Sequence, residues 1–298
     1  MKQFLFIVVL TVLSMGTVCF AEEEGELSKK AKKLLLLVFT QSAGYEHKPP
    51  KDGPKGRPGV VDQVMTELGK YHGFDVVCTK DGRIFDEDLG KYDAFVFYTS
   101  GDLTKKRINP PMSAKGKKQL LDAIAAGKGF LGLHSATDTF RTPDEEFAKT
   151  GKVDPYIEMI GGQFLNHGRQ QAGRLRVVSP DFPGADAWGK IDVVRIPQEE
   201  WYAMKHFNPD MHVIMVQETS GMKGNEYTRP DYPAVWARMH GKGRVFYTSM
   251  AHRIDTWRTP EFQKAIVGAV DWVTGRADAK IPTNFDQVTP RANVLKNE

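Results

Sequence analysis

Short, continuous apolar runs alternate with stretches of helical periodicity through the first half of the chain. The runs are bounded by Gly, Asp or Ser, which is typical of strands buried on both faces of a parallel sheet. They cover residues 34–39, 74–79, 92–98 and 129–134. Between them, apolar residues recur at helical spacing and glycines supply the stops. This alternation predicts an α/β fold with right-handed crossovers, in which helices cover both faces of a doubly wound, mostly parallel sheet.

The pattern changes in the second half. After Thr139 it loosens into connections rich in Gly and Pro, and we expect the later strands to add to the sheet in an antiparallel or mixed way. Strand-like runs resume at 174–179, 190–196, 213–217, 234–239 and 244–249. An amphipathic helix over 260–274 closes the pattern. We therefore expect one domain over residues 34–275, followed by a C-terminal extension, 276–298.

The N-terminus has the order of a secretory signal peptide. Lys2 precedes an apolar run, small residues follow up to Ala21, and an acidic stretch comes next. We expect a signal peptide over residues 1–21, cleaved after Ala21, and a charged leader over 22–33. The run is shorter than the roughly twenty apolar residues that span a bilayer. A periplasmic or secreted protein without stable membrane insertion is therefore expected; a membrane anchor or lipidation at Cys19 is the alternative.

Composition and charge argue against an intramolecular disulfide and against a nucleic-acid partner. The formal net charge is +4 at pH 7, and the chain has two cysteines. Cleavage would leave Cys78 alone, so no intramolecular disulfide could form and core burial would have to stabilise the fold. The basic cluster at 29–33 lacks interleaved aromatics, so we expect no nucleic-acid partner. We expect Cys78 to pack in the core as an unreactive thiol. A second copy of the chain is a possible partner, as a homo-oligomer.

The most informative stretch is GFLGLHSATDT, residues 129–139, where an apolar strand runs into small polar residues. It has the pattern of a nucleophile elbow, a sharp strand-to-helix turn that exposes one side chain at the carboxyl edge of a sheet. Gly132 and Ala136 occupy the small positions and His134 the central one.

The same stretch resembles the signature of the ThuA-like (trehalose utilisation) family, within the class I glutamine amidotransferase-like superfamily. Four further blocks that resemble the family follow in order, at residues 159–167, 199–202, 233–238 and 241–252. The resemblance implies a flavodoxin-like or amidotransferase-like fold, and a role in carbohydrate metabolism with a small-molecule carbohydrate as partner. Related amidotransferases carry a cysteine at the elbow, so His134 implies that glutaminase activity is absent.

Three histidines follow strands or Gly-rich turns, and we expect them to meet at the crevice where strand carboxyl ends gather. Imidazole serves both as a metal ligand and as a general acid or base. We expect His134 and His252, with Asp138, to be catalytic, and His134, His167 and His252 to be ligands of a divalent metal such as zinc. Their spacing is no local metal motif. The alternative is that each histidine only caps a turn or bonds a buried backbone group.

We expect substrate contacts from residues near strand ends, from one aromatic residue and from one basic residue. These candidates are His47, Ser100, Glu200, Tyr202 and Arg238. Tyr202 and its neighbour Trp201 could form an aromatic platform for a sugar ring, or could equally be core residues. Arg238 could bind an anionic group or be an ordinary surface charge.

No nucleotide or NAD site is expected, because Gly161-Gly162 lacks the spaced glycines of a dinucleotide fingerprint. These interpretations together predict an exported enzyme that acts on a sugar or oxidised sugar derivative, as a hydrolase, lyase or isomerase. The alternative is a non-catalytic carbohydrate-binding or accessory protein. The carbohydrate assignment depends on the family resemblance, since a fold does not by itself supply a function.

Overall fold

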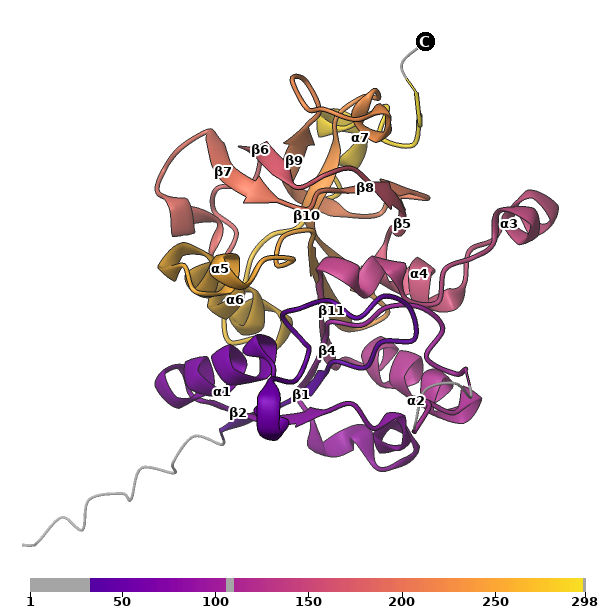
Figure 1. The fold of residues 1–298 in the computed structure, drawn as a ribbon, viewed down its shortest axis with the longest axis vertical. Helices are drawn as coiled ribbons and strands as arrows, with labels where there is room; N and C mark the ends of the chain where they lie inside the picture. The colour runs from indigo at the N-terminus through magenta and orange to yellow at the C-terminus, as the bar shows by residue number, and fades with distance from the viewer. Residues whose placement is uncertain (1–32, 106–109, 297–298) are drawn as a thin grey trace, which may run out of the picture. The chain divides into compact units, whose positions relative to one another are not determined.

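The computed structural model describes residues 33–105 and 110–296 (Figure 1). The expected signal peptide and nearly all of the charged leader lie outside the described residues. Among the helices that the structure does describe, none is both long and apolar enough to cross a membrane.

The core is a nine-stranded sheet in the order β2-β1-β3-β4-β11-β10-β9-β6-β7. Its strands are β1 (Leu34–Phe39), β2 (Phe74–Thr79), β3 (Ala94–Phe97), β4 (Gly129–Leu133), β6 (Gln171–Val177), β7 (Val193–Glu199), β9 (His212–Glu218), β10 (Tyr232–His240) and β11 (Gly243–Thr248). From β2 to β11 neighbouring strands are parallel, and from β11 to β7 they are antiparallel. The predicted fold class is confirmed, including the antiparallel additions from the second half.

Helices cover both faces of the parallel half. In Figure 1, α1 (Val60–His72), α5 (Ile254–Trp257) and α6 (Pro260–Val273) lie on one side of the sheet, and α2 (Ala114–Ala125) and α4 (Pro155–Ile160) lie on the other. Alternate residues of β1 belong to two different hydrophobic clusters, Leu36 and Val38 to one and Leu37 and Phe39 to the other. Burial on both faces explains the unbroken apolar run in the sequence.

The remaining elements are short. Two further α-helices are α3 (Asp144–Thr150) and α7 (Phe285–Val288), and single turns of 3₁₀ helix are η1 (Pro54–Gly56), η2 (Gly82–Asp86), η3 (Leu89–Lys91), η4 (His134–Asp138), η5 (Ala185–Trp188) and η6 (Asn225–Tyr227). The segment after α6 packs through α7 against β9, where the Asn284 side chain accepts a hydrogen bond from the Val213 amide at 2.7 Å.

A separate two-stranded antiparallel sheet joins β5 (Gln163–His167) and β8 (Tyr202–Lys205). The sequence analysis did not predict these two strands, but their pairing sets His167 opposite Tyr202. Cys78 lies on the edge strand β2 and is exposed, so the expectation that it packs in the core is wrong.

Candidate metal centre

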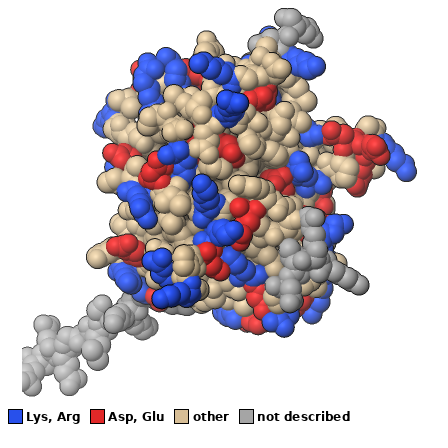
Figure 2. Space-filling model, viewed as in Figure 1, with Lys and Arg blue, Asp and Glu red and all other residues tan. Residues whose placement is uncertain are grey.

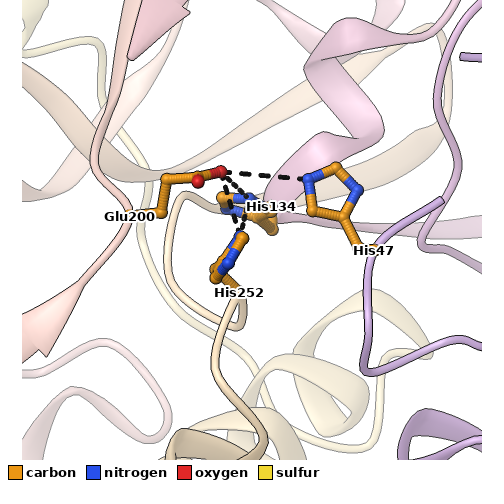
Figure 3. A group of neighbouring side chains, drawn as sticks. All are labelled: His47, His134, Glu200 and His252. Carbon is orange, nitrogen blue, oxygen red and sulfur yellow. Dashed lines mark hydrogen bonds and ion pairs between the residues drawn. The ribbon is translucent and has the colours of Figure 1, made fainter. Parts of the chain in front are cut away.

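Four side chains converge at one edge of the sheet: His47, His134, Glu200 and His252 (Figure 3). They come from the segments that follow β1, β4, β7 and β11. Strands β1, β4 and β11 run parallel, so the first, second and fourth of these segments leave the sheet at its carboxyl edge. One potential ligand atom from each side chain lies within 4.8 Å of all the others. The structure thus brings together His134 and His252, as the sequence analysis expected, and places with them His47 and Glu200, which were expected to contact substrate.

The elbow pattern of the sequence produces a sharp turn at His134. This residue begins η4 directly after β4 and has a φ of 43°, which is rare for a residue other than glycine. A Cβ atom at Gly132 would lie 2.8 Å from Ile160 Cδ1 and 3.3 Å from Ala136 Cβ. Small residues on either side of His134 therefore allow the turn to pack against its neighbours.

A backbone carbonyl orients the ring of His134. Its Nδ1 lies 2.9 Å from the carbonyl oxygen of Ser249. A carbonyl oxygen only accepts hydrogen bonds, so Nδ1 must carry a hydrogen, and Nε2 is the nitrogen left to face Glu200 or to bind a metal. Nε2 lies 3.4 Å from Glu200 Oε2. This is the usual arrangement of a metal-binding histidine, in which the second ring nitrogen donates to an orienting group.

Distances within the cluster fit an ion of the size of zinc. Glu200 Oε2 lies 2.9 Å from His252 Nδ1, 3.4 Å from His134 Nε2 and 3.9 Å from His47 Nε2. Tetrahedral zinc with bonds of about 2.1 Å separates its ligand atoms by roughly 3.4 Å. Three imidazoles and one carboxylate are also a donor set that divalent transition metals prefer.

The charge states of these groups suit a cation as well. His47 is 2% exposed; its burial, together with the neighbouring His134 and His252, lowers its pKa to about 2, so its ring is neutral near pH 7. Burial opposes ionisation of Glu200, but hydrogen bonds from His134 and His252 outweigh it and hold the pKa of Glu200 well below its usual range. A neutral imidazole and an ionised carboxylate are the forms that bind metals.

Sequence reasoning missed one buried residue that organises the cluster, Glu199. It is fully buried, and its Oε1 accepts a hydrogen bond from the Glu200 amide at 2.9 Å. Its Oε2 accepts from the Ala251 amide at 3.2 Å and from the Thr256 hydroxyl at 2.9 Å. Glu199 thus ties the backbone beside Glu200 to the backbone beside His252. The only signal in the sequence is a second glutamate next to a candidate.

Two other candidates, His167 and Asp138, are not among the four residues of the cluster. His167 Nδ1 is 3.6 Å from Glu200 Oε1, and its side chain is 41% exposed. Asp138 forms an ion pair with Arg141 at 2.9 Å. Burial raises the pKa of Asp138 to about 6, although Arg141 and His167 act in the opposite direction.

Two substrate-binding candidates have other partners. Ser100 is fully buried and donates to the carbonyl of Tyr45 at 2.8 Å. Arg238 donates to the carbonyl of Met159 at 2.8 Å and pairs across the sheet with Val245, near the start of β11, whereas the cluster lies beyond its end. The structure therefore does not bring Arg238 to the cluster.

The aromatic pair is buried. Trp201 is 1% exposed and Tyr202 3% exposed, which leaves neither ring a free face for a sugar. The Tyr202 hydroxyl instead lies 3.1 Å from His47 Nε2, and the Tyr202 ring packs 4.1 Å from the ring of His134. The core interpretation of Trp201 and Tyr202 is therefore the one that the structure supports.

Comparisons with known proteins agree with this architecture. The family described as "Trehalose utilisation" (ThuA) matches residues 35–273. A crystal structure of a ThuA-like protein from Parabacteroides merdae is 16% identical, with a TM-score of 0.60 over 89% of this chain and 99% of that one. A ThuA-like protein from Bacteroides uniformis is also 16% identical, with a TM-score of 0.58 over 84% of this chain and 95% of that one. At these identities the two structures support the fold alone. A search of curated proteins gives no match. Because the family match spans most of the sequence, the chain belongs to the ThuA family.

Proposed function

We propose that the protein binds a divalent metal ion such as zinc through His47, His134, Glu200 and His252, and that it is a metal-assisted enzyme of carbohydrate metabolism. Its substrate would be a sugar or an oxidised sugar derivative, and its reaction a hydrolysis, an elimination or an isomerisation. The observation that supports this most strongly is the convergence of four ligand atoms within 4.8 Å at a sheet edge. A bound divalent ion would act there as a Lewis acid on a substrate oxygen.

The chain's own residues would hold this centre in shape. The Ser249 carbonyl orients His134, and Glu199 positions the segments of Glu200 and His252. His167 is half-exposed beside the second oxygen of Glu200, where it can exchange protons with a bound molecule. An imidazole in place of a thiol at the elbow supports the absence of glutaminase activity, because acyl-enzyme chemistry needs a nucleophile there.

The test is metal content, measured by plasma mass spectrometry on protein purified without chelator or affinity nickel. We expect nearly one divalent ion per chain in the parent protein and its loss in His134→Ala and His252→Ala. His72→Ala is the matched control, because His72 is exposed at the end of α1 and should leave the metal content unchanged. A folded parent protein without metal would contradict the proposal.

A carbohydrate-binding protein without catalysis is the second candidate, and the exposed ring of Tyr45 beside His47 supports it. It predicts sugar binding without turnover. Calorimetry against a sugar panel, followed by product analysis with the best binder, separates the two functions.

We also propose that the protein is exported to the periplasm or secreted after cleavage behind Ala21. The order of charged, apolar and small residues at the N-terminus supports this. Intact-mass measurement of the protein from fractionated cells tests it: a mature chain that starts at Glu22 and lies outside the cytoplasm is expected. A full-length chain in the cytoplasmic fraction would contradict it.

A further inference from the structure

A cleft of about 690 Å³ opens directly beside the cluster, with Glu200 and His252 among its lining residues. This volume is in the range of small-molecule sites. The other wall comes from two segments: Tyr45 and Lys48 follow β1, and Arg253, Asp255 and Arg258 lie in and around α5. By contrast, the apolar cavity between α6 and the sheet has only about 20 Å³ of free volume, room for about one water molecule. The cleft is therefore the place where a substrate can meet the cluster.

The charges in this cleft leave a positive excess. Arg253 and Asp255 neutralise each other, with Arg253 Nε 2.8 Å from Asp255 Oδ1. Glu200 is engaged by the histidines. Lys48 and Arg258 are exposed, and neither forms an ion pair with any of the residues that the structure describes. On the face drawn in Figure 2, basic and acidic side chains are interspersed. A divalent ion on the single carboxylate of Glu200 would increase the positive excess in the cleft.

An aromatic ring stands at the edge of the same cleft. Tyr45 is 67% exposed, and its ring lies perpendicular to that of His47, edge to face, with centroids 4.9 Å apart. A hydrogen bond holds the backbone of Tyr45 in place, because the buried Ser100 hydroxyl donates to the Tyr45 carbonyl. A fixed, exposed ring with an apolar face matches the C–H face of a pyranose.

We propose that this cleft binds a sugar carrying an anionic group, either a carboxylate or a phosphate. Tyr45 stacks on the ring, Lys48 and Arg258 bind the anion, and a hydroxyl or carbonyl oxygen of the sugar reaches the histidine cluster. Lys48 supplies a mobile point charge, while the Arg258 guanidinium can bind either group through two parallel hydrogen bonds. The proposal deepens the proposed function, and its carbohydrate class depends on it.

Titration calorimetry with D-glucose, D-glucuronate and D-glucose 6-phosphate tests the proposal on the purified, metal-loaded protein. We expect at least one anionic sugar to bind about tenfold more tightly than glucose, and the tighter of the two identifies the anionic group. Lys48→Met and Arg258→Met should each weaken binding of that sugar by about 3- to 10-fold and leave glucose unchanged. Lys51→Met is the matched control, because Lys51 pairs with Glu46 and does not line the cleft. Tyr45→Ala should weaken all three sugars.

The outcomes are separable from those of the metal proposal when metal content is measured on the same samples. An anion preference that depends on Lys48 and Arg258 in a metal-free protein supports the anion site and contradicts the metal. Equal binding of glucose and the anionic sugars, no binding of any of them, or no effect of the two substitutions overturns the anion site, whatever the metal content.

Discussion

The histidine cluster depends on the buried carboxylate of Glu199. None of the hydrogen bonds described above for Glu199 is to an imidazole. Glu199 accepts hydrogen bonds from two backbone amides and one hydroxyl, on both sides of the cluster. Hydrogen bonds to an ionised acceptor are among the stronger ones in proteins. Ala251, one of the donors, has a φ of 98°, a strained conformation outside glycine. Glu199 therefore helps to hold a backbone that would otherwise relax and carry His252 away.

Glu199→Gln tests this positioning role. The amide nitrogen of glutamine would face a backbone N–H, so one hydrogen bond becomes a repulsive contact. We expect metal affinity, measured by competition with a chelator, to fall by about 10- to 100-fold, as for other outer-shell partners of metal ligands. Thr256→Val is the control, because it removes only the hydroxyl and should cost about 1 kcal/mol of stability. If Glu199→Gln lowers stability but leaves metal affinity intact, the role of Glu199 is structural only.

A second buried carboxylate, Asp62, makes stability depend on pH. Burial raises its pKa from 3.8 to about 6, although Lys80 acts in the opposite direction. Asp62 thus binds its proton more tightly in the folded protein than in the unfolded chain. Its contribution to stability is present below about pH 4 and is lost as the pH rises through about 6.

Asp62→Asn should remove this dependence. A shift of about two pKa units corresponds to about 3 kcal/mol, and the N-terminus of α1 favours the ionised form by about 0.5 kcal/mol, so we expect a gain of about 2 kcal/mol at pH 8. Near pH 4 the variant and the parent should be equally stable. Urea unfolding at both pH values measures the difference, with Glu67→Gln on the exposed face of α1 as control. A variant no more stable than the parent at pH 8 would show that Asp62 has other partners when ionised.

At the scale of elements, the sequence predicts the parallel half of the sheet well and the β5–β8 sheet not at all. Strands such as β1 are buried on both faces, so each leaves a continuous apolar run that can be read locally. The β5–β8 pair joins Gln163 to Lys205 across a long stretch of intervening chain. Neither strand shows clear alternation, and non-local pairing has no local signature.

The same contrast applies to the site. His47, His134 and His252 could be named from the sequence because each follows a strand at the carboxyl edge. Glu199 could not, because its role depends on two backbone amides that only the fold brings within reach. The sequence left Trp201 and Tyr202 open between a sugar platform and the core, since burial of an aromatic residue is decided by tertiary packing.

The turn from β4 into η4 is the element that aims His134, and Gly132→Ala should disturb it. The added Cβ would meet Ile160 Cδ1 at 2.8 Å and the Tyr247 ring at 3.2 Å. We expect a loss of about 1–3 kcal/mol from overpacking, measured by thermal unfolding, together with weaker metal binding. The double variant Gly132→Ala with Ile160→Val removes the closest atom and should recover part of both losses. Gly53→Ala, whose Cβ meets nothing closer than 3.5 Å, is the control.

At the scale of the whole molecule, metal binding should stabilise the fold. The four ligands come from segments spread between residues 47 and 252, and unfolding would separate them. An ion at a free concentration of about 100 times its Kd stabilises a protein by about 2.7 kcal/mol. For a domain of this size, Tm should rise by roughly 5–10 °C on addition of zinc. Scanning calorimetry with and without chelator checks this, and His252→Ala should show no rise.

Cys78 is the only cysteine among the described residues, so this part of the chain has no covalent cross-link of its own. An ion held by four segments would cross-link distant parts of the folded chain, as a disulfide does, but it would be released when the chain unfolds. Reducing agents would not break such a cross-link, whereas chelators or acid would remove the ion. Rigidity at the sheet edge would then follow the supply of metal rather than the redox state of the surroundings.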